Sequence, residues 1–479
     1  MRRLTVLLGV FLLCFYSIKV ASNIYLVNAE PRIIRVPEDY EKIQWAVGNA
    51  SAGDTIIVAA GTYYEHISIN KPLSLIGEDK ATTIIDGGGD GNIIEIWSNN
   101  VIVQGFTIQN GAQGIFIEDA SYVNISSNLI KNTSYAAIRI NDYSNNNTIS
   151  NNIVKQNDFT GIYVFWHSEN NTISNNYVSN NDVGIEIGVS SGNIVSNNII
   201  ENSVWEAILL FGACNYNRIY NNSVLLNGYG IKLEGQGPTP EYQPTENIVY
   251  DNIVSNNDVN IAVSQSSNNT IFHNNFIKKP YYNQVISENS KNDWDNGIEG
   301  NFWSDYLGVD LNGDCIGDTS YIIDENNTDR YPLIVPHIWN YSNPIPIVWE
   351  GKTYSIAIYS NSMVSDFKFN QPQMQISFNV SGPSDTSGYC NVTIPKTLLS
   401  DNPWTITIDG QPPTNIITSS NNTHSFLYFT YMHGSTKTVT IKGTNVIPEF
   451  PSTPILILLM LTTLIAITLW KTKRKRLIP

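Results

Sequence analysis

The residues best suited to chemistry recur in short alternating segments between about residues 114 and 234. In each segment one variable residue stands between two aliphatic residues that alternation turns inward. Aromatic rings and carboxylates that recur beside one another suit the faces and hydroxyl groups of sugars. We therefore predict a ligand-binding face that consists of Phe116, Arg139, Tyr163, Phe165, Trp166 and Glu186.

The turns that follow these segments hold the candidates for a catalytic group, which are Asp119, Asp142 and His167. Enzymes that cleave polysaccharides use paired carboxylates, or Ca²⁺ together with a base. An ordinary solvated face explains the same residues, and the sequence lacks the dense acidic or basic motifs of pectin hydrolases and lyases. We therefore favour a face without catalysis.

A third candidate is a metal site formed by Asp310, Asn312, Asp314 and Asp318, whose spacing resembles a calcium-binding loop. Cys315 stands where such a loop has glycine, and Tyr321 stands where an EF-hand has its final glutamate. A structural Ca²⁺ site and a turn rich in Asp and Asn both remain open.

The sequence gives little support for the binding of copper or of nucleic acid. The six histidines are scattered and no Met-rich or Cys-x-x-Cys cluster occurs, which argues against copper. The net charge of −15 disfavours nucleic-acid binding, which requires a basic face.

An internal repeat must position these residues. A phrase of the type Asn-Thr-Ile-Ser-Asn-Asn recurs, and its last Asn falls at 128, 152, 176, 198, 222, 252 and 274. The short, mostly β-branched segments are strands, and strands repeated at this period bury their apolar sides by stacking. We predict a right-handed parallel β-helix in which the recurring Asn adopts left-handed backbone at a corner and bonds the same Asn one coil away.

Other elements flank the repeat. Residues 38–49 read as an amphipathic helix, with Ile43, Ala46 and Val47 on one face, that caps the first coil. We place the capped β-helix at 30–300 and a C-terminal cap with the possible calcium loop at 301–340. Residues 347–443 alternate in short runs, as in a small immunoglobulin-like β-sandwich. A protruding loop is expected around residues 235–244.

Both ends of the chain suggest export. Residues 1–29 resemble a signal peptide. Residues 444–454 read as a linker, 455–470 as an apolar transmembrane helix, and 471–479 as a basic cytoplasmic tail. This order predicts an extracytoplasmic protein at the cell surface, held by a single C-terminal anchor. The many N-x-S/T sequons suit glycosylation of the exported part.

Two segments together resemble the NosD-type β-helix family. Ile34-Arg35-Val36-Pro37 with Gly61-Thr62-Tyr63 is similar to the opening of that family, and Gly300-Asn301-Phe302-Trp303 with Tyr331-Pro332-Leu333 to its close. The resemblance implies a right-handed β-helix of the kind found in carbohydrate-binding proteins and sugar hydrolases. It also implies a periplasmic role linked to copper-site maturation. Pro448-Glu449-Phe450-Pro451 resembles archaeal PEF-CTERM sorting tails.

The expected fold class is therefore all-β. Our first functional hypothesis is a surface-anchored protein that binds glycans or another cell-envelope component without catalysis. The alternatives are a polysaccharide lyase or hydrolase that acts on the aromatic-acidic face, and a NosD-type accessory protein in copper enzyme maturation.

Overall fold

A computed structural model of the chain describes residues 30–443 except 238, 313, 335–336, 338–344, 350–351, 361, 382–386, 400–402 and 435. The predicted signal peptide, the linker, the transmembrane helix and the basic tail lie outside the described residues. Within the described residues, no helix has both the length and the apolar character needed to cross a membrane.

The helical cap is present but shorter than predicted. Helix α2 spans Ile43–Asn49 and buries Ile43, Ala46 and Val47 against the first coil. It does not begin at Glu38, because Arg35 and Asp39 hydrogen-bond each other and form a turn there. The carboxylate of Glu65 accepts hydrogen bonds from the first two helical amides, at 3.0 and 2.9 Å, and so fixes the start of the helix.

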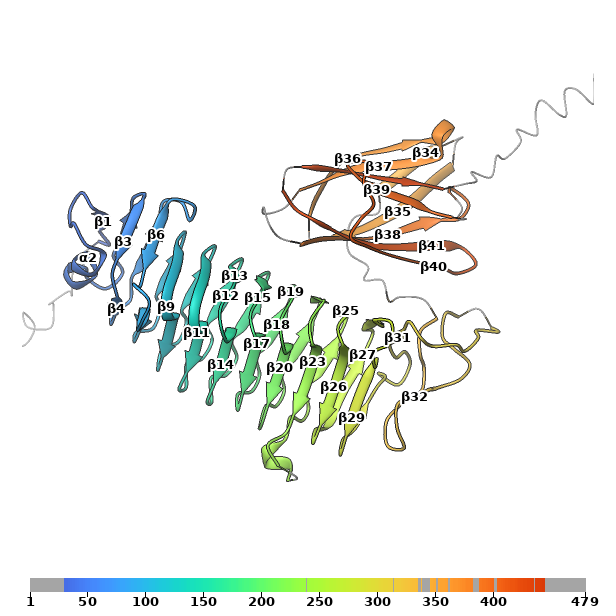
Figure 1. Cartoon of the computed structure of the whole chain (residues 1–479), viewed down its shortest axis with the longest axis horizontal. Coiled ribbons are helices and arrows are strands. Elements are labelled where there is room, and N and C mark those ends of the chain that lie inside the picture. Colours follow the sequence, from blue (N-terminus) through green and yellow to red (C-terminus); the bar gives the residue numbers. More distant parts are fainter. Residues whose placement is uncertain are drawn as a thin grey trace, which may run out of the picture.

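The repeat forms a parallel β-helix with three strand columns (Figure 1). The first column is a 12-stranded sheet. It consists of β1 (Ile33–Val36), β2 (Thr55–Val58), β5 (Ser74–Gly77), β8 (Ile102–Gln104), β10 (Asn124–Ser126), β12 (Thr148–Ser150), β15 (Thr172–Ser174), β18 (Ile194–Ser196), β21 (Arg218–Tyr220), β24 (Ile248–Tyr250), β27 (Ser267–Phe272) and β30 (Lys291–Asp293).

The second column follows the first after a sharp corner. It contains β3 (Gly61–Tyr64), β6 (Thr83–Asp86), the first half of β9 (Thr107–Glu118), the first half of β11 (Leu129–Asn141), β13 (Ile153–Lys155), β16 (Tyr177–Ser179), β19 (Ile199–Glu201), β22 (Ser223–Leu225), β25 (Ile253–Ser255), β28 (Asn275–Ile277) and β31 (Phe302–Trp303).

The third column completes each coil. It contains β4 (Ile67–Ile69), β7 (Asn92–Ile96), the second halves of β9 and β11, β14 (Thr160–Phe165), β17 (Val183–Gly188), β20 (Glu206–Phe211), β23 (Tyr229–Glu234), β26 (Val259–Ser264) and β29 (Val285–Glu288). The loop after β23 protrudes as predicted and carries the short helix η1 (Pro240–Tyr242) (Figure 1).

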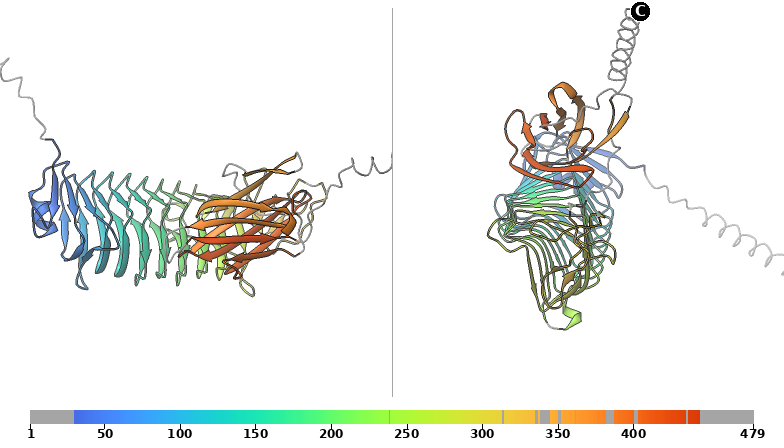
Figure 2. Two further views of the ribbon diagram at one scale, coloured as in Figure 1. Left: turned by 90° about the horizontal axis from the view of Figure 1, so that it is seen from above. Right: turned by 90° about the vertical axis from the view of Figure 1, so that its right-hand side faces the viewer.

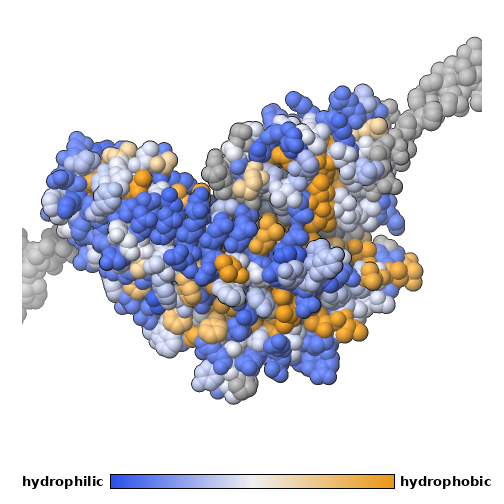
Figure 3. Space-filling model, in the orientation of Figure 1, coloured by the Kyte–Doolittle hydropathy of each residue, from blue (hydrophilic) through white to orange (hydrophobic). Residues whose placement is uncertain are grey.

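The interior of the coils is a continuous stack of aliphatic side chains. Ile115, Ile138, Ile162, Ile185 and Ile208 follow one another in register and are fully buried. Each coil buries apolar area only because a neighbour lies above and below it. The face of the molecule in Figure 3 is mainly hydrophilic, with apolar residues in separate patches.

The predicted asparagine ladder is confirmed, and a second one runs parallel to it. Oδ1 of Asn152 accepts hydrogen bonds from the backbone and side-chain amides of Asn128, at 3.0 and 3.2 Å. The same pattern continues through the following coils to Asn301, and another begins at Asn147 and ends at Asn327. Inward amides thus satisfy the backbone groups that each corner takes out of the sheets.

One detail of the ladder prediction is wrong. The left-handed residue at the corner is the one before the ladder Asn, for example Asn151 with φ 58° and Asn175 with φ 57°. The ladder Asn must point inward to meet its neighbours, so its exposed predecessor makes the turn. Asn tolerates this conformation better than most residues.

The C-terminal part closes the coils and then forms a sandwich. Asn301, the last residue of the first ladder, donates its backbone N–H to the buried Asp329 at 2.7 Å, beside the hairpin of β32 (Tyr321–Ile322) and β33 (Thr328–Asp329). The sandwich has a five-stranded and a four-stranded antiparallel sheet. The first contains β34 (Ile345–Trp349), β35 (Lys352–Ser360), β38 (Ser387–Pro395), β41 (His424–Met432) and β40 (Asn415–Ser420). The second contains β36 (Met363–Asn370), which leads through the helix η2 (Gln371–Gln373) to β37 (Gln375–Ser381), with β42 (Lys437–Lys442) and β39 (Thr405–Ile408). An immunoglobulin-like topology stays a prediction.

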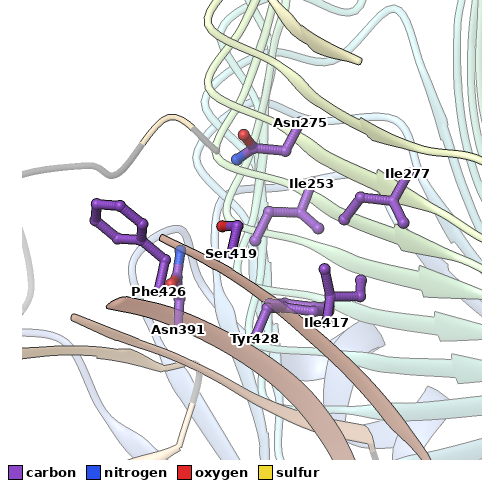
Figure 4. Close-up of a pocket in the computed structure, with 8 residues that line it drawn as sticks. All are labelled: Ile253, Asn275, Ile277, Asn391, Ile417, Ser419, Phe426 and Tyr428. Atoms are coloured by element: carbon purple, nitrogen blue, oxygen red, sulfur yellow. The ribbon is translucent and has the colours of Figure 1, made fainter. Parts of the chain in front are cut away.

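The sandwich packs beside the last coils of the β-helix (Figures 1 and 2). Ile253 and Ile277 from β25 and β28 face Ile417 and Tyr428 from β40 and β41 (Figure 4). The cavity between them has a volume of about 10 Å³, enough for roughly one water molecule. The interface is therefore closely packed and apolar.

Candidate functional site

The predicted binding face lies on the third strand column. Phe116, Arg139, Tyr163 and Glu186 are in register on β9, β11, β14 and β17. The guanidinium carbon of Arg139 lies 5.6 Å from the ring centres of both Phe116 and Tyr163, and 5.5 Å from that of Tyr135. Cation–π attraction thus holds Arg139 among three rings.

Much of this column is covered by its neighbours, although its side chains point away from the interior. Phe116 and Tyr163 are each 8% exposed, and Glu186 is 9% exposed. The accessible rings beside this column include Trp166, which the sequence prediction included, and Tyr135, Tyr143 and Phe159, which it missed. Tyr135 and Phe159 stack on each other with ring centres 5.5 Å apart, so their outer edges form one surface.

The three candidate catalytic residues lie on the turns that follow β9, β11 and β14 on successive coils. The backbone amide of Asp119 donates to the carbonyl of Asp142, so these residues occupy equivalent corners of successive coils. His167 stacks on Tyr143, with ring centres 5.4 Å apart, and lies against Trp166. The imidazole is therefore part of an aromatic surface.

Asp142 instead has a carboxylate partner that the sequence prediction did not choose. Glu118, two residues after Phe116, shares a hydrogen bond with Asp142 and accepts another from Asn141 at 3.4 Å. Burial and the neighbouring Asp142 raise the pKa of Glu118.

Glu186 is the second carboxyl group with a shifted pKa. Burial, together with the negative charge of Glu206, raises its pKa to about 7, although Thr160 donates a hydrogen bond to it at 3.4 Å. Glu206 itself pairs with Lys232 at 3.2 Å.

A polar groove with a volume of about 620 Å³ opens where the second column turns into the third near the N-terminal end. It is lined by Tyr64, Asp86, Gly88, Gly89, Asn110, Gly111, Asn132, Ser134, Gln156 and Asp158. Ser134 and Asp158 immediately precede the stacked rings of Tyr135 and Phe159, so the groove continues into the aromatic surface. The turn at residues 87–91 gave no functional signal in the sequence.

Asp86 is one of two acidic residues that line this groove, together with Asp158. Burial opposes its charge, but hydrogen bonds from Gln109, from the amide of Gly88 and from Asn110 hold its pKa below the usual range. The two side-chain amides each lie 2.8 Å from Oδ2. The groove therefore presents a fixed negative charge among neutral amides.

The predicted calcium residues are brought together in one exposed loop. Asp310 accepts from the amides of Asp314 and Cys315, and Asp314 from that of Ile316. Asn312 donates to Asp314 at 3.0 Å, and Asp318 accepts from the amide of Leu311. These bonds shape the loop, and calcium binding there stays a prediction.

A histidine cluster near the C-terminal end was missed entirely. The rings of His273 and His337 stack with centres 3.8 Å apart. Potential ligand atoms of Asp251, His273 and His337 all lie within 4.8 Å of one another. Burial lowers the pKa of His273 and lowers that of His337 to about 3, so both rings are neutral at pH 7. The interpretation of the histidines as scattered is wrong for this pair.

Comparison with known proteins identifies the family. A family model described as "Periplasmic copper-binding protein (NosD)" matches residues 47–246 and 165–308, which together span more than half of the chain. The chain belongs to the NosD family. The resemblance to this family is thereby confirmed.

One curated relative of this NosD family member is a cell surface glycoprotein from Methanothermus fervidus. It is 35% identical over 107 residues, which represent 22% of this chain and 18% of the relative. The match thus spans about a fifth of the length of either protein.

Solved structures show a distant likeness. The alginate lyase from Paenibacillus sp. str. FPU-7 has a TM-score of 0.45 and 15% identity, over 54% of this chain and 99% of the lyase. The Dettilon tailspike protein has a TM-score of 0.47 and 13% identity, over 85% of this chain and 93% of the tailspike. Neither likeness bears on function at this level.

The family description names copper, and the histidine cluster offers ligands for it. Imidazole and carboxylate groups suit Cu²⁺, whereas Cu⁺ prefers the soft sulfur of Cys and Met. The donor set of Asp251, His273 and His337 therefore fits a divalent copper ion, and these three residues would hold it.

Proposed function

We propose that this NosD family protein binds an extended glycan of the cell envelope along the third strand column, without catalysis. The observation that carries the proposal is the continuity between the polar groove and the accessible rings of Tyr135 and Phe159. A sugar chain needs both surfaces, because its ring faces are apolar and its edges carry hydroxyl groups.

The size of the groove supports an extended ligand. Asp86, Asn110, Asn132 and Gln156 lie on successive coils. Adjacent strands are about 4.8 Å apart, so these four residues span roughly 14 Å along the β-helix axis. The aromatic surface continues past the groove to Trp166, which lengthens the site further.

The chemistry of the groove supports a neutral or weakly charged sugar. The side-chain amides can donate to and accept from hydroxyl groups, and the ionised Asp86 accepts strongly from them. The name of the glycoprotein relative supports a location at the cell surface. The export signals predicted at both ends of the chain agree with that location.

The carboxylate geometry gives a reason to prefer binding over hydrolysis. Glycosidases place their two carboxyl groups about 5 to 10 Å apart, to admit a sugar carbon or a water molecule between them. Glu118 and Asp142 are hydrogen-bonded to each other, which leaves no such space. Assays for new reducing ends and for unsaturated products on any bound glycan are expected to remain at background.

Removal of one accessible ring tests the binding face. Trp166→Ala is expected to weaken binding of the best ligand on a glycan array by about fivefold, since loss of an aromatic contact is worth roughly 1 kcal/mol. The matched control is Trp45→Ala, because Trp45 is 50% exposed on helix α2 and Trp166 is 44% exposed. Equal binding by both variants, or no glycan bound by the wild type, would contradict the proposal.

A further inference from the structure

The residue type at the corner between the first and second strand columns changes near the C-terminal end of the β-helix. Along most of the β-helix the left-handed residue at this corner is Asn, at positions 151, 175, 197 and 221. The next two coils carry Asp251 and His273 there, with the same φ of 57°. Parallel pairing of β24 with β27 places these two residues side by side.

A third ligand group arrives from a distant segment. His337 follows the hairpin of β32 and β33, and its backbone is fixed to Asn275 by two hydrogen bonds of 2.7 and 3.1 Å. This anchoring places the His337 ring on that of His273. Nε2 of His337 lies 3.4 Å from Oδ1 of Asp251, and Nδ1 of His273 lies 3.7 Å from the same oxygen.

These separations match those between ligands of one ion. Zinc binds His nitrogen and carboxylate oxygen at about 2.0 to 2.2 Å with tetrahedral geometry, so its ligand atoms lie roughly 3.3 Å apart. The two distances to Asp251 exceed this value by only a few tenths of an ångström, and the two histidine ligand atoms lie within 4.8 Å of each other. A small movement of these partly buried side chains would close the difference.

Glu299 supplies the carboxylate that many metal-binding histidines have beside their second ring nitrogen. Its Oε2 lies 2.7 Å from Nε2 of His273, the ring nitrogen that faces away from Asp251. A carboxylate in this place keeps the proton on Nε2 and leaves the lone pair of Nδ1 for a metal. Glu299 is thus placed as a positioning residue.

We propose that Asp251, His273 and His337 bind a divalent transition-metal ion, which fastens His337 to the last coils of the β-helix. Imidazole and carboxylate ligands select ions such as Zn²⁺ and Cu²⁺ over Ca²⁺ and Mg²⁺. Asn275 holds the backbone of His337 and also lines the cavity between the β-helix and the sandwich. The ion would therefore stiffen this interface, a role separate from glycan binding.

Titration of the metal-free full chain with Zn²⁺ and with Cu²⁺ tests the site. One ion per chain is expected to bind, with Cu²⁺ the tighter of the two, and the Cu²⁺ EPR spectrum should show coupling to two nitrogen atoms. His273→Ala and His337→Ala should each lower the affinity at least ~100-fold, since loss of a supporting partner alone costs about 10- to 100-fold. Glu299→Gln should lower it by ~10-fold and leave two nitrogen ligands in the spectrum.

His66→Ala is the matched control, because His66 is exposed at the other end of the β-helix. It should leave affinity and spectrum unchanged. Zn²⁺ should raise the melting temperature of the wild type and of this control, but not of His337→Ala. The proposal fails if the wild type binds neither ion, if Ca²⁺ competes equally, or if His66→Ala weakens binding as much as His273→Ala.

Discussion

Replacement of Asn198 by alanine is expected to lower the free energy of unfolding by about 4 kcal/mol. Oδ1 of Asn198 accepts from the backbone and side-chain amides of Asn176, at 2.9 and 3.0 Å. Its own amide donates to the carbonyl of Ile173 at 2.9 Å and to Asn222 at 3.0 Å. Alanine would leave three or more buried polar groups without partners, each worth about 1 to 3 kcal/mol.

Urea unfolding followed by circular dichroism measures this loss. The matched control is Asn197→Gly, because Asn197 is exposed, has φ 56° and stands next to Asn198. Glycine adopts that backbone readily, so the control should stay within about 0.5 kcal/mol of the wild type. Equal destabilisation by the two substitutions would mean that the inward ladder does not hold the coils together.

Glu186→Gln is expected to stabilise the protein above neutral pH. The carboxyl group of Glu186 is nearly buried, and its pKa is raised to about 7 in the folded chain from an ordinary value of 4.5. Stability contributed by the protonated group is fully present below pH 4.5 and is lost as the pH rises through 7. The difference of 2.5 pKa units corresponds to about 3 kcal/mol of stability lost by pH 8.5.

Glutamine imitates the protonated carboxyl group and has no charge to bury. The variant should therefore match the wild type near pH 4.5 and exceed it by up to about 3 kcal/mol at pH 8.5. Urea midpoints at several pH values between these limits give the comparison. Glu241→Gln, on the exposed protruding loop, controls for the removal of one negative charge. A constant difference between Glu186→Gln and the wild type at every pH would exclude this explanation.

Part of the candidate site could be predicted because it repeats. The register of Phe116, Arg139, Tyr163 and Glu186 follows directly from the alternating phrase, and the pairing of the strands confirms it. The alternation does not tell how far neighbouring coils cover a side chain. Tyr163 is nearly buried, with 8% of its surface exposed. Tyr135 stands just before the part of β11 that belongs to the third column, and it is 37% exposed.

The histidine cluster, in contrast, could not be predicted in full from the repeat. Asp251 and His273 carry a signal in the sequence, since they occupy the corner position that holds Asn in the preceding coils. His337 carries none, because its place depends on two hydrogen bonds to Asn275, 62 residues earlier in the chain. The pairing of Glu118 with Asp142 likewise joins adjacent coils and not adjacent residues.

The sequence by itself determined the β-helix, its coil spacing, its inward ladder and its family. A period of 22 to 30 residues with alternating aliphatic residues can be satisfied only by stacked coils, so the local pattern and the global fold agree. Tertiary structure alone decided where the polar groove opens, which rings remain accessible and which ligand groups meet at the C-terminal corner. Those features depend on contacts between segments whose sequences do not repeat. The spacing of the repeat therefore gives no information about these contacts.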